Sequence, residues 1–210
     1  MSDVYFKMRN IELSFEGKRV LHDFNLTVKK GEKVLLYGDS GGGKTSVLNL
    51  LMGFLRPHSG EIMFRGEHIS KDNVWDIRRK IAYVPQSTDM SGNTVMELIE
   101  TITGYRSNRD KCCSMSKTIE WLEYFDMSDR YLYKHFNELS GGEQQRVLII
   151  ISLILKREVF LLDEPTASLD TGKKNKVAEL FTGHSDWTVI IVSHDNLWRE
   201  SDNIRIIDMD

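Results

Sequence analysis

The segment Gly38-Asp39-Ser40-Gly41-Gly42-Gly43-Lys44-Thr45 decides the fold, because it fits the pattern G-x4-G-K-[ST] of a phosphate-binding loop. Its glycines allow the backbone to curl so that successive N–H groups point inward at phosphate oxygens. Lys44 can then reach the β and γ phosphates, and the Thr45 hydroxyl can ligate Mg2+. The segment therefore indicates a site for a nucleoside triphosphate rather than a flexible glycine turn.

The residues around this loop alternate between strand and helix patterns. A short apolar strand precedes the loop, and helical spacing follows it, so a helix N-terminus adds partial positive charge at the phosphates. Such alternation predicts a parallel sheet covered by helices on both faces. The expected strands are 33–37, 61–64, 81–84, 159–162, 188–192 and 204–207, and the expected helices are 44–54, 143–155 and 173–181.

Two further regions complete the predicted fold. Residues 4–13 and 20–28 alternate apolar and polar side chains with Gly17 between them, which favours an antiparallel strand pair with one wet face. Residues 94–127 have helical periodicity and form an expected helical insert. The fold class is therefore α/β, with a mainly parallel sheet, an N-terminal antiparallel β subdomain and an inserted helical subdomain. We expect one domain over 1–210, with 1–86 and 140–210 as the nucleotide-binding core and 87–139 as the helical subdomain.

Two carboxylates, Asp163 and Glu164, follow the wholly apolar strand expected at 159–162. In open parallel sheets, ligands bind beyond the carboxyl ends of the strands. Asp163 is then placed to hold Mg2+ through its water shell, and Glu164 to accept a proton from an attacking water. The alternative is that Asp163 and Glu164 form an acidic turn without function. The presence of a phosphate-binding loop in the same chain makes this alternative the weaker one.

A second glycine-rich segment, Leu139 to Arg146, opens the long helix expected from residue 143. Ser140 and Glu143 have the spacing of a capping box. Two glycines in a first helical turn are poor helix formers, and they make sense if backbone N–H groups must approach an anion closely. The segment therefore predicts a second anion site.

These motifs, in this order, resemble the ATP-binding-cassette (ABC) ATPases over nearly the whole chain, Val4 to Asp208. The resemblance implies ATP and Mg2+ as cofactors. It also implies a head-to-tail, ATP-dependent homodimer, in which the signature motif of one copy binds the γ-phosphate held by Lys44 of the other. The matching signature residues are Leu139, Ser140, Gly141, Gly142, Glu143 and Gln144.

The resemblance assigns further roles residue by residue. Phe15 matches an aromatic that stacks on adenine, Gln86 a glutamine that contacts Mg2+ and the attacking water, and His194 a histidine that contacts the γ-phosphate. Each residue also has an alternative without function: Phe15 as an ordinary strand aromatic, Gln86 as a loop amide and His194 as a capping histidine. Ser168 and Asp170 match the loop that crosses to the second subunit. The expected nucleotide-binding residues are Phe15, Gly38, Asp39, Ser40, Gly41, Gly42, Gly43, Lys44, Thr45 and Ser46; the catalytic ones Lys44, Gln86, Glu164 and His194; and the metal ligands Thr45, Gln86 and Asp163.

The sequence departs from the family pattern at two places. The arginine that the family often has in the helix after the signature is replaced within Ile149-Ile150-Ile151-Ser152, and the frequent Asp-Pro before the acidic strand is replaced by Arg157-Glu158. Both changes concern packing rather than chemistry, because every residue to which the family gives a role in hydrolysis has its counterpart.

Composition limits the partners and the compartment. The net charge is −3 and no dense basic cluster is present, so no nucleic acid partner is expected, and the basic segment 106–111 is interpreted as a solvated loop. The most apolar run, 147–155, is shorter than the roughly 18 residues of a membrane span. With no signal pattern at the N-terminus, we expect a cytoplasmic protein, peripheral on the inner face of the membrane. Adjacent Cys112 and Cys113 are expected to be inert thiols.

Transport through a separate membrane permease is the leading functional prediction. The resemblance points to the surface around Gln86 and residues 87–102, with Met90, Ser91 and Gly92, as the dock, although an ordinary surface loop is equally compatible. Residues 91–95 loosely resemble export-type cassettes. A soluble mechanical ATPase acting on ribosomes or DNA repair intermediates is the alternative; such relatives usually carry tandem cassettes, coiled coils or basic arms. A non-hydrolysing regulatory binder is disfavoured by Glu164 and His194. We expect no regulatory C-terminal domain after the last strand.

Overall fold

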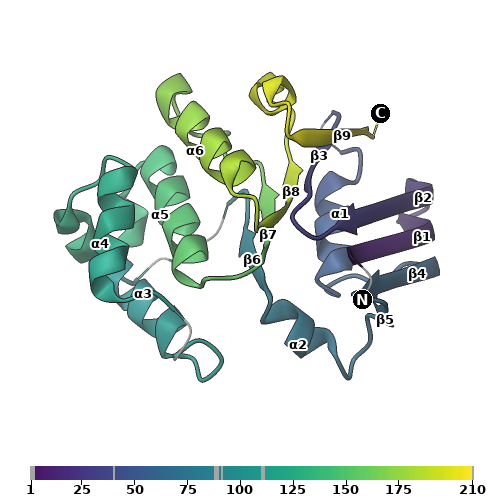
Figure 1. Ribbon diagram of the computed structural model, residues 1–210, viewed down its shortest axis with the longest axis horizontal. Helices are drawn as coiled ribbons and strands as arrows, with labels where there is room; N and C mark the ends of the chain where they lie inside the picture. Colours follow the sequence, from purple (N-terminus) through teal and green to yellow (C-terminus); the bar gives the residue numbers. More distant parts are fainter. Residues whose placement is uncertain (1–2, 40, 88–89, 91, 110–111, 210) are drawn as a thin grey trace.

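A five-stranded parallel sheet forms the centre of the molecule (Figure 1). The computed structural model describes residues 3–39, 41–87, 90, 92–109 and 112–209. All neighbouring strands in the sheet run parallel, as the alternation of strands and helices predicts. In spatial order, the strands are β6 (Ile81–Val84), β7 (Val159–Asp163), β8 (Thr188–Val192), β3 (Lys33–Tyr37) and β9 (Ile204–Asp208).

Side chains of the inner strands alternate between two hydrophobic cores. Phe160 and Leu162 of β7 face one core, while Val159 and Leu161 face the other. The same alternation occurs in β3 and β8, which explains why these strands are continuous apolar runs. The predicted last strand, 204–207, is present as edge strand β9, but its five residues are all exposed or only half-buried. The sheet is therefore covered on both faces everywhere except at this edge.

A second, antiparallel sheet covers one side of the parallel sheet, on the right of Figure 1. Its first two strands pair antiparallel, as the sequence predicts, and both are longer than the alternating pattern indicated. The register shifts between Met8 and Ile11, where Asn10 has a φ of 48°, so the pair contains an irregularity that breaks strict alternation. In spatial order, the strands are β2 (Lys18–Lys29), β1 (Val4–Phe15), β4 (Ser59–Phe64) and β5 (Glu67–His68). The strand expected at 61–64 therefore pairs antiparallel with β1 and does not belong to the parallel sheet.

Six α-helices surround the sheets in the described part of the chain. The helix after the phosphate loop ends at Leu51 instead of reaching residue 54, because Gly53 has a φ of 66°. The short helix α2 was not predicted, since five residues carry too little periodicity to recognise. The helices are α1 (Lys44–Leu51), α2 (Val74–Arg78), α3 (Val95–Gly104), α4 (Met115–Tyr124), α5 (Gly141–Ile154) and α6 (Thr171–Gly183), with short 3-10 helices at Asp129–Tyr133, Phe136–Glu138 and Asn196–Glu200.

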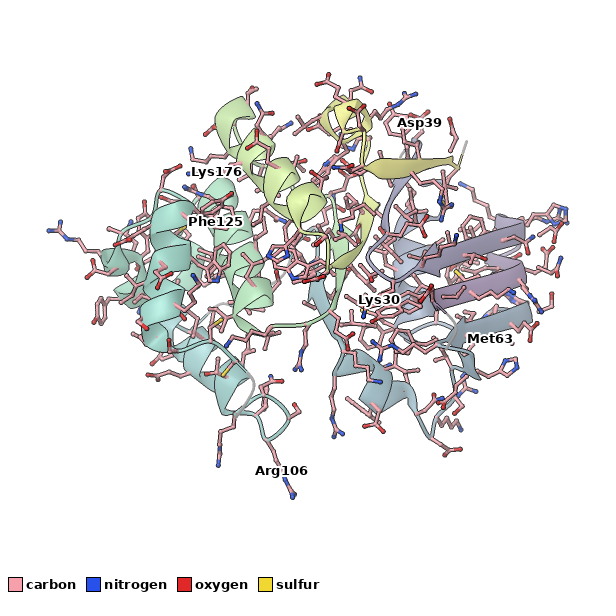
Figure 2. All side chains as sticks on the ribbon, in the orientation of Figure 1. Lys30, Asp39, Met63, Arg106, Phe125 and Lys176 are labelled. Carbon is pink, nitrogen blue, oxygen red and sulfur yellow. The ribbon has the colours of Figure 1, made fainter. Side chains whose placement is uncertain are left out.

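The helical subdomain expected at 87–139 contains α3 and α4, and these helices lie beside α5 and α6 on the left of Figure 1. Leu98 of α3 and Leu122 of α4 belong to the same hydrophobic core as α5 and one face of the parallel sheet. Its treatment as a separate subdomain, residues 87–139, therefore stays a prediction. In Figure 2, Arg106 extends from this segment away from the rest of the molecule, and the residue is exposed. This placement agrees with a solvated loop.

The described residues contain no helix long and apolar enough to cross a membrane. Cys112 and Cys113 are free and half-buried, and burial raises the pKa of the Cys113 thiol. A raised pKa lowers the thiolate fraction, which agrees with an inert Cys113.

A buried tyrosine links the antiparallel sheet to the start of β7. The Tyr5 hydroxyl donates to Glu158 Oε2 at 2.7 Å and accepts from Arg65 Nη2 at 2.6 Å. Arg65 also stacks over the Tyr5 ring and pairs directly with Glu158. Glu158 therefore connects the two sheets next to β7, the strand that leads to Asp163 and Glu164. It is one of the two residues at the position where ABC ATPases often have Asp-Pro.

Removing the Tyr5 hydroxyl tests this link. We expect Tyr5→Phe to lower the free energy of unfolding by about 1 kcal/mol, the usual net contribution of a partly buried hydrogen bond. Urea unfolding measures the change. Arg9→Gln, which breaks the exposed Arg9–Glu61 pair, is the matched control, with an expected change below about 0.5 kcal/mol. Equal effects in the two variants would contradict a special role for this link.

Candidate nucleotide site

The predicted site residues meet at the carboxyl ends of four adjacent strands. Strand β6 leads to Gln86, β7 to Glu164, β8 to His194 and β3 to the phosphate loop. Parallel strands place these ends at one edge of the sheet, which is where ligands bind in open α/β folds. A cavity of about 320 Å³ opens there, and its lining residues are Phe15, Val20, Gly41, Gly43, Lys44, Thr45, Ser46, Gln86, Asp163, Glu164, Val192 and His194.

The phosphate loop is curled around the ammonium group of Lys44. Lys44 Nζ donates to the carbonyls of Gly38 at 2.7 Å and Asp39 at 2.6 Å, and the side chain is buried. Gly43 has a φ of 84°, and a Cβ there would lie 2.7 Å from Val20 Cγ1, so only glycine fits. Ser40, a predicted phosphate contact, lies outside the described residues. The lysine charge thus sits at the centre of the loop, where a phosphate tail would arrive.

Two residues of the predicted metal site are in direct contact. Thr45 Oγ1 donates to Asp163 Oδ1 at 3.1 Å, and Gln86 lines the same cavity. Burial raises the pKa of Asp163, an effect that a bound cation would oppose. Hydroxyl, amide and carboxylate oxygens are the hard ligands that Mg2+ takes, usually with one or two carboxylates and substrate phosphates. The oxygens of Thr45, Gln86 and Asp163 therefore fit Mg2+. The described residues hold no cluster of three His, Cys, Asp or Glu side chains.

Glu164 and His194 also lie in contact. His194 Nδ1 is 2.9 Å from Glu164 Oε1, and the two side chains come from the ends of neighbouring strands. The glutamate is buried, whereas the histidine side chain is 63% exposed. The pair therefore combines a carboxylate held inside the cavity with an imidazole that reaches the solvent side, as a base and a phosphate contact require.

Phe15 is the last residue of β1, and 44% of its surface is exposed. Its ring lines the cavity next to Val20 rather than packing into a core. An ordinary strand aromatic would be buried or would lie elsewhere, so this placement favours the stacking interpretation, since an exposed ring face is what a base needs.

The signature segment shows the predicted capping box. Glu143 N–H donates to Ser140 Oγ at 3.4 Å, and Ser140 N–H donates to Glu143 Oε2 at 2.8 Å. Leu139 is buried in the core, and the Gln144 amide donates to the carbonyls of Phe136 and Leu139. These inward contacts leave Ser140 and Gly141 exposed, while Gly142 is half-buried.

A glycine is required at position 142 by packing within the chain, in addition to its predicted role in the second anion site. A Cβ at Gly142 would lie 2.7 Å from the Ser168 carbonyl oxygen, so the glycine allows the expected dimer loop to approach α5. In that loop, Asp170 caps α6, because its carboxylate accepts from Lys173 N–H at 3.0 Å. The signature and the dimer loop therefore form one exposed surface of the chain.

That surface does not contribute to the cavity. None of the described signature residues, nor Ser168 or Asp170, lies among the residues that line it. A single chain thus brings together the phosphate loop, Phe15, Gln86, the acidic pair and His194, and leaves the second predicted anion site elsewhere.

Four residues of the site were not predicted from the sequence. Tyr83 donates to Asp163 Oδ2 at 3.3 Å, and Ser193 donates to Glu164 Oε2 at 3.2 Å. Val20 and Val192 form part of the cavity wall. Burial and the neighbouring Asp163 carboxylate raise the pKa of Tyr83, which keeps its hydroxyl protonated as a donor. Proximity to Gln86 and His194 in sequence was the available signal for Tyr83 and Ser193, whereas Val20 had none.

Comparison with known proteins identifies the family of the chain. The family described as ABC transporter matches residues 21–167. The chain therefore belongs to the ABC transporter family and is an ATP-binding cassette.

Individual relatives cover most of the chain. It is 36% identical over 193 residues to the spermidine/putrescine import ATP-binding protein PotA of Spiroplasma citri, with 90% of this chain and 54% of PotA covered. It is 31% identical over 193 residues to the ergothioneine transport ATP-binding protein EgtV of Helicobacter pylori (strain G27), with 90% and 89% covered. The chain thus spans about half of PotA, and only 15% of ABC transporter B family member 2 of Dictyostelium discoideum, to which it is 30% identical.

Solved structures of one bacterial cassette, MJ0796, have the same fold. The dimeric structure is 28% identical with a TM-score of 0.79, covering 97% of this chain and 94% of that one. A dimeric post-hydrolysis state of MJ0796 with ADP and phosphate is 29% identical with the same TM-score and coverage. The α/β fold and the sheet arrangement are thereby confirmed.

Acid sensitivity of the signature segment follows from the contacts of Glu143. The hydrogen bonds from the Tyr131 hydroxyl, at 2.7 Å, and from Ser140 lower the pKa of Glu143 from 4.5 to about 2. Because the pKa of this carboxyl group is lower in the folded chain than in the unfolded chain, the ionised group stabilises the fold above pH 4.5. This contribution to the free energy of unfolding is lost as the pH falls towards 2. We expect the stability difference between the wild type and Glu143→Gln to shrink over that range, measured by urea unfolding at pH 6, 5, 4 and 3.

Glu100→Gln provides the control for this measurement. Its carboxylate is exposed on α3 and makes no hydrogen bond or ion pair with the described residues. The control should follow the wild-type curve at every pH. A constant difference between the wild type and Glu143→Gln down to pH 3 would contradict the assigned contacts.

Proposed function

We propose that two copies of this chain bind ATP between them, head to tail, and that hydrolysis releases the pair. One observation carries the proposal: the phosphate cavity is built without the signature, while Ser140 and Gly141 are exposed on another surface. A signature from the second copy would supply backbone N–H groups and a helix N-terminus to the γ-phosphate. ATP thus connects the copies, and loss of the γ-phosphate loosens them.

The residues of one chain divide the hydrolysis chemistry among them. Lys44 and the loop amides hold the phosphate tail, and Thr45, Gln86 and Asp163 are the ligands that would hold Mg2+. When bound, Mg2+ would neutralise charge on the phosphate oxygens. These roles are supported by the shared cavity and the Thr45–Asp163 contact.

The proton of the attacking water passes to Glu164 in this proposal. Glu164 is buried beside the cavity and its carboxylate accepts hydrogen bonds from neighbouring side chains. His194 orients the γ-phosphate and, through Nδ1, the glutamate. General-base action of this kind contributes about 100-fold to 10,000-fold to a rate.

Replacing Glu164 by Gln separates binding from turnover. We expect Glu164→Gln to lose at least about 100-fold in kcat, because the amide cannot accept the proton. With Mg-ATP it should accumulate as a dimer, since the connecting γ-phosphate stays in place. Light scattering after size exclusion measures the dimer, and phosphate release measures turnover.

Two further variants make the result specific. Lys44→Ala should neither dimerise nor turn over ATP, because it loses the phosphate contact. Glu179→Gln, a charge removal on an exposed position of α6, should behave as the wild type. A Glu164→Gln protein that stays monomeric and hydrolyses ATP would refute the proposal.

We further propose that the cassette powers transport by binding a separate integral membrane subunit on its cytoplasmic face. PotA and EgtV are named as transport ATP-binding proteins, and residues of the segment after Gln86, including Gly92 and Asn93, are exposed. Met90 is half-buried and packs against the core, which supports a shallow, partly apolar dock. Ser91 lies outside the described residues, and export-type transport stays a prediction.

Copurification tests the membrane partner. We expect the tagged chain to bring down a multi-span membrane protein from detergent-solubilised membranes, and Asn93→Arg at the proposed dock to reduce its yield. Glu179→Gln serves as the control with an unchanged yield. Recovery of ribosomes or DNA repair proteins instead would favour the soluble mechanical ATPase.

A further inference from the structure

We propose that Ser193 is a positioning residue, which holds the carboxylate of Glu164 in place for its action on the attacking water. The inference rests on the base role proposed for Glu164. Ser193 precedes His194 at the end of β8, and its side chain is fully buried. Ser193 is not among the residues that line the cavity, whereas its partner Glu164 is, so Ser193 would act through Glu164 and not on the nucleotide.

The hydrogen bonds of Ser193 have a defined direction. Asp195 N–H donates to Ser193 Oγ at 3.0 Å, and Ser193 Oγ lies 3.2 Å from Glu164 Oε2. A hydroxyl has one proton, and an ionised carboxylate can only accept. Because a backbone amide occupies an acceptor position of the hydroxyl, the proton of Ser193 is directed to the glutamate.

The two oxygens of Glu164 are held differently. Oε2 accepts from the fully buried Ser193, whereas Oε1 faces His194, whose side chain is 63% exposed. An exposed histidine can rotate when a nucleotide enters, but a buried serine between packed strands cannot. Ser193 therefore provides the permanent contact, and it leaves Oε1 on the cavity side to receive the proton.

The backbone of Glu164 is anchored by the same strand. Glu164 has a φ of 47°, a left-handed conformation that is uncommon for residues other than glycine. Its N–H donates to the Val192 carbonyl at 2.9 Å. The end of β8 thus holds both the backbone and the side chain of the glutamate, and the serine hydroxyl is the part that selects the carboxylate position.

Asp195 is in turn fixed from α6. Its Oδ2 pairs with Lys174 Nζ at 2.6 Å, and its Oδ1 accepts from Leu197 N–H at 3.2 Å. Both groups of the ion pair are less than one third exposed. These contacts keep the Asp195 amide aimed at Ser193, so the hydroxyl cannot turn away from Glu164.

Kinetics of Ser193→Ala test the assignment. Misplacing a reacting group by about 1 Å can cost about 100-fold, so we expect kcat to fall between tenfold and 100-fold. The KM for Mg-ATP should stay within about twofold, because the phosphate contacts are intact. Ser193→Cys, which fills a similar space but is a weak donor, should show the same fall and serves as a second variant if the alanine protein does not fold.

Ser152→Ala is the matched control. Ser152 is equally buried, in α5, and its hydroxyl donates to the Ile149 carbonyl. A general effect of deleting a buried hydroxyl would lower kcat in this variant too, whereas a positioning role predicts wild-type kcat. Unchanged kcat in both Ser193 variants, or an equal loss in Ser152→Ala, would overturn the proposal.

A double variant distinguishes this inference from the proposed function. Under single-turnover conditions, Ser193→Ala should add no further loss in a Glu164→Gln background, because it acts only through the carboxylate. An additive loss would overturn the positioning role. Normal turnover of Glu164→Gln alone would refute the proposed function itself, while an inactive Glu164→Gln beside a fully active Ser193→Ala would refute only the inference.

Discussion

The parallel pairing of four strands is the constraint on which the rest of the molecule depends. Since β6, β7, β8 and β3 run in one direction, their carboxyl ends meet at a single edge, and each end carries one part of the site. Two separate cores, one on each face, stabilise this arrangement. A strand reversed within the sheet would remove its part of the site from the cavity.

The acidic pair shows how the sheet separates two neighbouring residues of equal charge. Asp163 ends β7 and contacts Thr45 and Tyr83, on the side of the phosphate loop and β6. Glu164 adopts a left-handed backbone and contacts Ser193 and His194, on the side of β8. In the proposed mechanism, one carboxylate therefore faces the proposed metal ligands and the other faces the attacking water.

The signature segment is held in shape by hydrogen bonds within a single chain. The Ser140–Glu143 capping box caps α5, and the side-chain amide of Gln144 donates to two carbonyls of the preceding turn. Gly142 makes room for the loop at Ser168, so its glycine has a use within one chain as well as the one proposed across the dimer. The exposed residues are therefore preformed, which would reduce the conformational entropy lost on binding the proposed second copy.

The motifs, the parallel sheet and the antiparallel pair could be predicted from the sequence alone, because glycine spacing, apolar runs and alternation are local signals. Short elements such as α2 and β5, the exposed edge β9 and the end of α1 were missed or misjudged, since they depend on neighbours rather than on periodicity. Likewise, Lys44 and Glu164 were found by their motifs, whereas Tyr83, Val20 and Ser193 were not. Their contacts join residues far apart in sequence, such as Tyr83 with Asp163, and only the packing of strands against each other brings such groups within hydrogen-bonding distance.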